Sequence, residues 1–348
     1  MILWSGFLLL IACFCLSKQT ILAVVLYNII TFAFSISLLA CVALLYVIRK
    51  YKRLQSVLYD FFLFFKSKML KKTQLSYDKR LIFKHYILYV LRYIRALEFV
   101  KTPIYKQAKQ DKLLSYKLFF VNYSSMFVMF NEIFGHEVYK FSSDTKTPVI
   151  IDAGSNIGLA ILYFKACFPD AHIIGFEPGP ETFQILQKNV IENKLANVTI
   201  HNKALDNKTG QITFYTCKDN AAIGGWSLKS QTSTAYQECP QLIDATPLSP
   251  YITQPVDLLK MDIEGAETAV LEELASSGKL KLVKRIILEY HHHMVNVNED
   301  NLSLVLKLFE DNGFGYQFNY VELAVPEKNN RNVLILYIYN KALVTHNL

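Results

Sequence analysis

Several groups that could do chemistry follow two short apolar runs of the sequence. The stretch "LLKMDIEGAE" places Lys260 and Asp262 two positions apart, so both lie on one face of a strand. The run "KRIILEY" contains Glu289 as its next-to-last residue and is followed by His291, again with matching parity. Active sites of open α/β sheets lie beyond the carboxyl ends of the strands. If the two runs are neighbouring parallel strands, Asp262, Glu264, Glu289 and His291 meet at one edge of the sheet.

Three roles are open for this cluster. Asp262 or His291 could take a proton from a substrate hydroxyl as a general base. Asp262, Glu289 and His291 could instead ligate magnesium or manganese, which would acidify the hydroxyl. In a purely structural role, Glu264 and Glu267 would stabilise the N-terminus of the next helix and Lys260 would pair with an acid. We favour a functional Asp262, structural Glu264 and Glu267, and a site without a metal.

A second candidate site is the glycine-bearing turn in "VIIDAGSNIG", residues 149–158. A dinucleotide turn has the spacing G-x-G-x-x-G, but here Asn156 replaces the second glycine and Asp152 precedes the turn. A carboxylate repels a pyrophosphate, whereas it attracts the sulfonium and ammonium groups of S-adenosylmethionine. Gly154 would let the backbone pass close to the ligand, and Gly158 would let the next helix approach the sheet. The turn therefore predicts S-adenosylmethionine as the cofactor.

Two further positions complete the predicted cofactor site. Glu177 ends the next apolar run, 19 residues after Gly158, where an acid can accept hydrogen bonds from ribose hydroxyls. NAD sites share this feature, so it does not discriminate between the cofactors. The third run, "NVTIHNKAL", ends near the expected adenine, where Asp206 or the backbone of Ala204 could meet the adenine amine. Asp206 could equally well cap a turn.

The elements that must position these groups alternate along the chain. Short β-rich runs and helical segments follow one another, which predicts a mostly parallel sheet covered by helices. Two consecutive strands then end the chain as an antiparallel pair at the sheet edge, which is typical of Rossmann-like class I methyltransferases and not of dehydrogenases. The predicted strands begin at 148, 172, 197, 256, 284, 313 and 332, and the helices span 157–167, 180–193, 265–278 and 299–312.

The motifs resemble those of the FkbM family of S-adenosylmethionine-dependent methyltransferases. The resemblance covers about residues 120–320 and includes "VIIDAGSNIGLAILYF", "NVTIHNKALDNKTGQITFY", "VDLLKMDIEGAETAVLEEL" and "IILEYH", together with the upstream "NEIFGHEVYKF". The family commonly has Ala at the position of Ser155. The resemblance implies O-methylation, commonly of sugar or polyketide hydroxyls.

The N-terminal part has a different composition. Residues 1–48 carry one charged side chain, Lys18, and two apolar runs, 2–16 and 21–48; the second exceeds the roughly 20 residues that cross a bilayer. Residues 49–118 hold 18 Lys and Arg against four acids, interleaved with aromatic residues. This pattern favours contact with an anionic lipid surface on the cytoplasmic side over binding of nucleic acid. We predict an anchor at 1–48 with one or two helices, a basic helical region at 49–118 and a catalytic domain at 119–348.

The leading hypothesis is a membrane-anchored O-methyltransferase that acts on a glycan or glycolipid in the cytoplasm. One alternative is an NAD(P)-linked oxidoreductase of nucleotide sugars, although no Tyr-x-x-x-Lys pair follows the fourth strand. A second is a membrane scaffold whose methyltransferase-like fold no longer turns over. The acceptor, O- or N-methylation and the oligomeric state stay open at this point.

Overall fold

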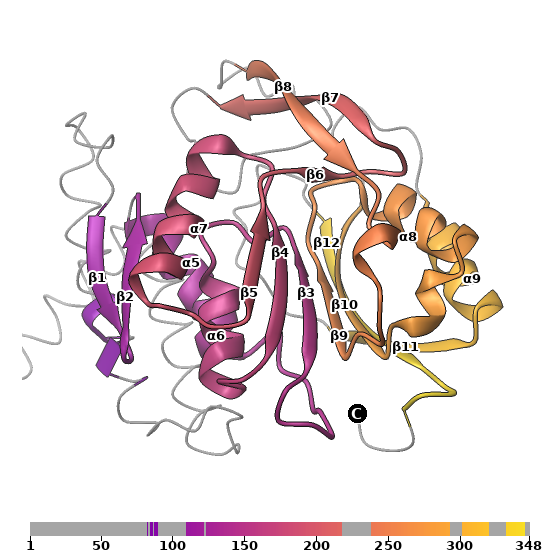
Figure 1. Ribbon diagram of the computed structural model, residues 1–348, viewed down its shortest axis with the longest axis horizontal. Coiled ribbons are helices and arrows are strands. Elements are labelled where there is room, and N and C mark those ends of the chain that lie inside the picture. Colours follow the sequence, from indigo (N-terminus) through magenta and orange to yellow (C-terminus); the bar gives the residue numbers. More distant parts are fainter. Residues whose placement is uncertain are drawn as a thin grey trace, which may run out of the picture. The chain divides into compact units, whose positions relative to one another are not determined.

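The computed structural model describes residues 82, 84–85, 87–89, 109–121, 123–217, 238–292, 301–319 and 332–344 (Figure 1). The chain divides into two compact units, Met1–Phe62 and Leu63–Leu348, and every described residue belongs to the second. Among the described residues, no helix is both long enough and apolar enough to cross a membrane. The predicted anchor at 1–48 and most of the basic region lie outside the described residues, so the predicted domain boundaries stay predictions.

Seven strands form the central sheet, in the order β11-β12-β10-β9-β3-β4-β5. The five strands from β5 to β10 pair in parallel. The chain runs from β3 outward to β5 and then returns to β9 on the other side of β3, so the direction of winding reverses between β3 and β9. Ligands bind at such switch points. The strands are β3 (Val149–Ala153), β4 (His172–Phe176), β5 (Val198–His201), β9 (Leu258–Met261), β10 (Arg285–His292), β11 (Phe314–Asn319) and β12 (Asn332–Asn340).

Helices cover both faces of this sheet because its strands are apolar on both sides. Helices α6 (Leu159–Cys167) and α7 (Pro180–Glu192) lie on one face, and α8 (Glu267–Ser276) and α9 (Leu302–Asp311) on the other (Figure 1). Buried side chains of α8 and α9, among them Leu271 and Phe309, pack against strand residues such as Ile151 and Leu288 in one continuous core. Continuous apolar strands of this kind are typical of parallel sheets covered on both faces. The predicted α/β class with a mostly parallel sheet is confirmed.

The C-terminal strands refine one detail of the prediction. Strands β11 and β12 are antiparallel to each other, as expected. They do not simply extend the edge, because β12 lies between β10 and β11 and pairs antiparallel with β10 over eight residues, from Arg285–Tyr339 to His292–Asn332. Strand β12 is thus a central strand, consistent with its apolar sequence "VLILYIY".

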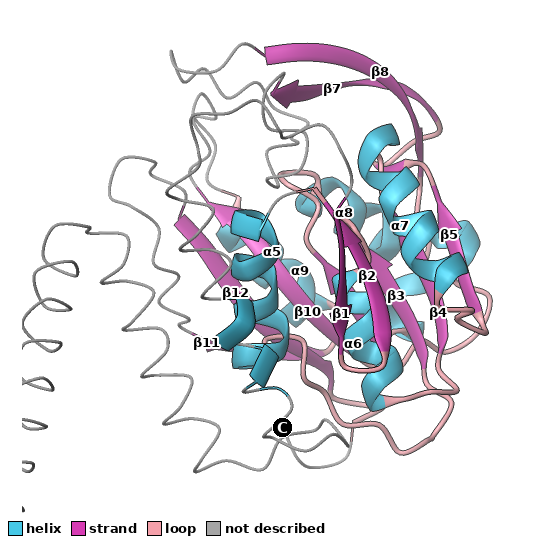
Figure 2. Ribbon diagram, turned by 90° about the vertical axis from the view of Figure 1, so that its left-hand side faces the viewer, coloured by secondary structure: helices cyan, strands magenta, loops and turns pink. Residues whose placement is uncertain are grey.

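Several elements outside the sheet were absent from the sequence prediction. A hairpin, β1 (Lys109–Leu113) and β2 (Tyr116–Phe120), precedes helix α5 (Tyr123–Phe130) and the π-helix η1 (Asn131–His136). A second, three-stranded sheet has the order β6-β8-β7. Its long β7–β8 ribbon lies at one end of this unit, at the top of Figures 1 and 2. The strands are β6 (Ala204–Leu205), β7 (Gly210–Cys217) and β8 (Glu238–Thr246).

The second sheet corrects the predicted third strand, which was expected to run from 197 to 205. Strand β5 ends at His201, and Ala204 and Leu205 pair with Ala245 and Thr246 in the other sheet. The backbone turns between the two because Asn202 donates hydrogen bonds to the carbonyls of Glu177 and Pro178 instead of continuing the ladder.

Candidate functional site

The glycine turn after β3 is held against the end of β9. Gly154 adopts φ +86°, and a Cβ atom at this position would overlap the main-chain oxygen of Asp262. The amide of Asp262 in turn donates to the carbonyl of Ala153 at 3.0 Å. Gly154 is therefore required for the close contact between the loop that follows β3 and the loop that follows β9. Gly158, at φ +87°, lies against Leu186 of α7, so it lets the neighbouring helix approach the turn.

Asn156 shows how the turn works without the second glycine of a dinucleotide motif. Its φ of +49° is left-handed, a conformation that asparagine adopts more readily than most other side chains. Its amide donates to Oε2 of Glu177 at 2.9 Å, and the amide of Gly179 donates to Oε1 at 2.8 Å. Glu177 thus joins the turns that follow β3 and β4. Burial raises the pKa of Glu177 from 4.5 to about 7, although these two N–H groups partly offset the effect.

Asp152 is a fully buried carboxylate beneath this turn. Its side chain is 0% exposed, and neither oxygen accepts a hydrogen bond from the described residues. The nearest cation is Lys260, whose Nζ lies 3.3 Å from Oδ1. Burial raises the pKa of Asp152 above its ordinary value, and Lys260 opposes that rise. A buried carboxylate without hydrogen bonds is unusual in folded proteins and favours a positively charged ligand nearby.

Lys260, predicted as a catalytic candidate, connects the two strand ends. Its Nζ donates to the carbonyl of Gly154 and lies 3.6 Å from Oδ2 of Asp262. It also lies 5.3 Å from the ring centre of Tyr139. Burial alone would lower its pKa, but Asp152, Asp262 and Glu289 outweigh burial and raise the pKa. Lys260 is therefore a protonated positioning residue in this structure.

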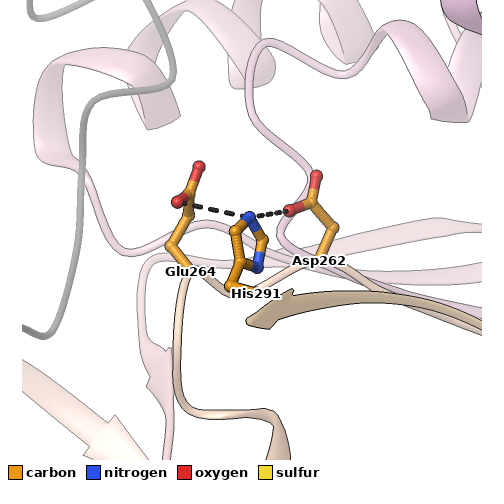
Figure 3. A group of neighbouring side chains, drawn as sticks. All are labelled: Asp262, Glu264 and His291. Carbon is orange, nitrogen blue, oxygen red and sulfur yellow. Dashed lines mark ion pairs between the residues drawn. The ribbon is translucent and has the colours of Figure 1, made fainter. Parts of the chain in front are cut away.

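The acids after β9 gather around one histidine, His291, at the end of β10 (Figure 3). Its Nε2 lies 3.4 Å from Oε2 of Glu264 and 3.9 Å from Oδ1 of Asp262, while Nδ1 lies 2.9 Å from Oε1 of Glu267. Burial lowers the pKa of His291, but Glu264, Glu267 and Asp262 together raise it well above its ordinary value. The structure thus brings the predicted pair Asp262 and His291 together.

The predicted place at the start of a helix is confirmed for Glu267 but was wrong for Glu264. Helix α8 begins at Glu267, and Glu264 lies in the loop before it with φ +53°. Glu264 therefore does not belong to the first helical turn and contacts His291 instead. Glu267 does lie in the first turn, where it accepts a hydrogen bond from the amide of Gly265, but the same oxygen also meets His291.

Glu289 shares one strand face with His291 and is half-buried. Burial raises its pKa well above the ordinary value, and the charge of Asp262 raises it further. Glu132 of η1 adds to this effect, and the hydroxyl of Tyr139 has a pKa raised well above its ordinary value by burial and then by Asp262 and Glu289. Sequence reasoning missed Glu132 and Tyr139. Both lie in the upstream segment "NEIFGHEVYKF", which was noted for its resemblance but was given no chemical role.

The remaining two candidates lie in the second sheet. Ala204 is buried in the small cluster formed by β6, β7 and β8. Oδ1 of Asp206 accepts a hydrogen bond from the amide of Asn207 at 2.8 Å, so the structural role left open for Asp206, that of a turn cap, is present. Asn202, which holds the ends of β4 and β5 together, was not predicted.

Comparison with known proteins adds a family to this geometry. Residues 152–318 match the model of the methyltransferase FkbM domain. "Methyltransferase 1" of Beauveria bassiana is 27% identical over an alignment of 214 residues, and the match covers 56% of this chain and 84% of that protein. "2-O-methyltransferase NoeI" of Sinorhizobium fredii is 25% identical over an alignment of 177 residues, and the match covers 46% of this chain and 70% of that protein.

Among solved structures, the chain is similar to a methyltransferase FkbM from Methylobacillus flagellatus, with 16% identity and a TM-score of 0.40. The likeness covers 62% of this chain and 54% of that one, so the chain spans about half the length of that structure. The family match begins at Asp152, at the glycine turn, and includes the acids after β9 and the end of β10. The chain therefore carries a region, residues 152–318, that matches the methyltransferase FkbM domain.

Proposed function

We propose that this protein transfers a methyl group from S-adenosylmethionine to a hydroxyl of a sugar, on a glycan or glycolipid at the cytoplasmic face of a membrane. The match of residues 152–318 to the methyltransferase FkbM domain supports methyl transfer as such. The cofactor, the oxygen acceptor and the location are our proposals, and each depends on its own observation.

The buried carboxylate of Asp152 carries the cofactor proposal. It is fully buried beneath the turn, its oxygens accept no hydrogen bond that meets the geometric criteria within the described part of the chain, and the nearest cation is Lys260 at 3.3 Å. A ligand with positive charge over the turn lowers the free energy of this carboxylate, whereas a pyrophosphate raises it. S-adenosylmethionine has a sulfonium and an ammonium group and no phosphate. The left-handed Asn156 in place of a second glycine agrees with this choice over NAD.

Glu177 supports the same assignment from the neighbouring strand. Each of its oxygens accepts one backbone N–H, and a carboxylate oxygen has lone pairs for a second hydrogen bond. Glu177 is thereby held in position, and we assign it to the two ribose hydroxyls. Because this feature also suits NAD, it supports a nucleoside ligand without selecting between the two.

When bound, S-adenosylmethionine supplies a methyl group that an oxygen nucleophile displaces from sulfur. The protein must orient a hydroxyl and accept its proton. We assign acceptance of the proton to Glu289, which shares one strand face with His291 at the end of β10. We assign the orientation of the hydroxyl to Asp262, which ends β9 and is 26% exposed.

The acceptor and location rest on weaker but specific support. A relative, NoeI of Sinorhizobium fredii, is named a 2-O-methyltransferase. The apolar runs at 2–16 and 21–48 and the basic region after them favour a tether to a membrane, which raises the effective concentration of the enzyme near a lipid-linked acceptor.

Calorimetric titration of the full-length protein in detergent tests the cofactor. We expect S-adenosylmethionine to bind and NAD not to bind, and Asp152→Asn to weaken binding by at least about tenfold, or 1.4 kcal/mol. Asp257→Asn is the matched control, because Asp257 is also a buried acid paired with a lysine, Lys284 at 2.8 Å, but at the opposite end of β9.

The two variants separate the outcomes. Equal weakening by Asp152→Asn and Asp257→Asn would mean that loss of a buried ion pair, and not loss of charge at the cofactor, explains the effect. Binding of NAD alone would replace the proposal with the oxidoreductase hypothesis, and a folded chain that binds neither ligand would favour the scaffold hypothesis.

A further inference from the structure

We propose that Asp262, Glu264 and His291 form a binding site for one divalent metal ion of the manganese type. Ion binding can be tested without any assumption about the reaction. Its use in catalysis, to hold the acceptor oxygen next to Asp262, rests on the proposed function. The sequence analysis favoured a site without a metal, but the geometry of the three side chains favours a metal site.

The three side chains converge from two neighbouring strand ends. Asp262 and Glu264 come from the loop after β9, and His291 comes from the end of β10 with its ring between them (Figure 3). One donor atom from each lies within 4.8 Å of the other two. Donor atoms about 2.1 Å from a shared ion stand about 3.0 Å apart at right angles and about 3.4 Å apart at tetrahedral angles. The observed 3.4 Å and 3.9 Å from Nε2 therefore need only small movements.

Glu267 fixes the orientation of the histidine. The His291 side chain is only 5% exposed, and its Nδ1 lies 2.9 Å from a Glu267 oxygen that is itself buried. Nε2 points at the two acids, and with Nδ1 held by Glu267 it is Nε2 that would give up its proton to an incoming ion and bind that ion through the lone pair. Among the described residues, Nε2 takes part in ion pairs only and has no hydrogen bond. A carboxylate that holds the far nitrogen of a ligating imidazole is the usual arrangement around protein-bound metals.

The charges around the site also favour a cation. Glu267 adds its carboxyl group to those of Asp262 and Glu264. The neighbouring lysine, Lys260, is already shared with Asp152. An ion with two positive charges would relieve the repulsion among these acids, and its bound hydroxyl would lose a proton more readily.

The donor set narrows the choice of ion. Two carboxylates with open positions for water suit magnesium, calcium and manganese, whereas the imidazole suits transition metals. Manganese satisfies both preferences. Sulfur donors, which would select zinc or copper(I), are absent from this group of three.

Manganese titration of the full-length protein, after removal of metals with EDTA, tests the site directly. Electron paramagnetic resonance measures free Mn²⁺, and we expect one bound ion per chain. His291→Ala and Asp262→Asn should each weaken binding by at least tenfold, and Glu267→Gln should weaken it less, because Glu267 acts only through His291. Circular dichroism checks that each variant is folded.

Two matched controls remove the same kinds of side chain elsewhere. His172→Ala and Asp244→Asn change an exposed histidine and an exposed aspartate outside the cluster, and both should bind Mn²⁺ as the wild type does. The inference is overturned if the wild type binds no Mn²⁺, or if His291→Ala and Asp262→Asn, once folded, bind it as tightly as the controls.

A second titration separates this inference from the proposed function. S-adenosylmethionine is added to the EDTA-treated wild type. Cofactor binding without Mn²⁺ binding would leave the methyltransferase proposal intact and remove the metal site. Mn²⁺ binding that depends on His291 but occurs without cofactor binding would support the metal site and remove the cofactor proposal.

Discussion

At the scale of single residues, one glycine determines how closely the two halves of the site meet. Gly154→Ala would place a methyl group against the main-chain oxygen of Asp262 and force alanine into a left-handed conformation. The conformation costs about 1–2 kcal/mol, and the displaced β9 loop adds to it. We expect the free energy of unfolding to fall by about 3 kcal/mol or more in urea denaturation, with loss of cofactor binding.

Gly278→Ala is the control for this prediction. Gly278 also has a positive φ, +71°, but a Cβ atom there would meet nothing within 4 Å. This variant should lose only about 1 kcal/mol and keep cofactor affinity. Equal losses in the two variants would show that the left-handed conformation, and not the contact with Asp262, explains the requirement for glycine.

Glu177 gives the site a predictable pH dependence. Its pKa is about 7 in the folded chain against 4.5 in the unfolded chain, so folding favours the protonated form. The stability from this group is fully present below about pH 4.5 and is lost as pH rises through about 7, a change of about 3 kcal/mol. Ribose hydroxyls donate to the ionised form, so cofactor affinity should rise over the upper part of the same range.

Calorimetry measures the cofactor affinity, and urea denaturation measures the free energy of unfolding, each between pH 5 and 8. Glu177→Gln should remove the pH dependence of both quantities. Glu181→Gln changes an exposed acid in the first turn of α7 and should leave both pH dependences unchanged. Persistence of the wild-type slopes in Glu177→Gln would assign the titration to another group.

Residue types and parity predicted much of the site but not its details. Asp262, Glu289 and His291 were expected at one edge of the sheet because strand alternation and sheet order fix where those side chains emerge. The role of Glu264 was missed, since it depends on a left-handed backbone after β9 that spacing does not reveal. Tyr139 was missed because its contact with Lys260 joins segments more than 100 residues apart.

At the scale of elements, helix α7 holds the β1–β2 hairpin through two asparagines one turn apart. Asn189 accepts from the amide of Phe119, and donates to the carbonyls of Phe119 and Ile157, all within 2.9 Å. Asn193 makes the same pair of bonds with Lys117 nearer the surface. The two side chains thus form hydrogen bonds with the backbone groups on the outer edge of β2, as a further strand would.

Asn189→Ala should therefore destabilise the hairpin strongly. It leaves three backbone groups of Phe119 and Ile157 without partners at a position only 1% exposed. We expect a loss of about 2–4 kcal/mol and faster hydrogen exchange at Phe119. Asn193→Ala, the exposed counterpart, should cost less than about 1 kcal/mol. If both variants lose the same free energy of unfolding, burial of the Asn189 hydrogen bonds does not add to their contribution to stability.

Elements formed by local sequence patterns could be predicted, whereas elements that depend on contacts between distant segments could not. The strands and helices of the central sheet have strong local patterns, and their predicted positions agree with the structure within a few residues. The β7–β8 ribbon was missed because its strands pair with each other and with β6, outside the central sheet. The end of β5 was misplaced because Asn202, and not a turn signal such as glycine or proline, redirects the chain.

At the scale of the whole molecule, the acidic cluster at the ends of β9 and β10 and the apolar N-terminal runs belong to different units of the chain. The cluster lies in the unit Leu63–Leu348, whereas Met1–Phe62 contains both predicted apolar runs. The basic region 49–118 extends across the boundary between the two units, so it is not confined to the apolar part. Attachment to the membrane is the predicted role of the apolar runs.

That role can be tested by alkaline carbonate extraction of membranes from cells that express the full chain. We expect the wild type to stay in the membrane pellet, because the run 21–48 is long enough to span a bilayer. Leu38→Lys with Leu39→Lys should release more of the protein, since each lysine near the middle of a span costs about 2.5–3.5 kcal/mol. Leu304→Lys, at an exposed position of α9, is the control and should not change the fractionation. Retention of the double variant would assign the anchor to residues 2–16, and release of the wild type would remove the anchor from the proposed function while leaving the methyltransferase chemistry untouched.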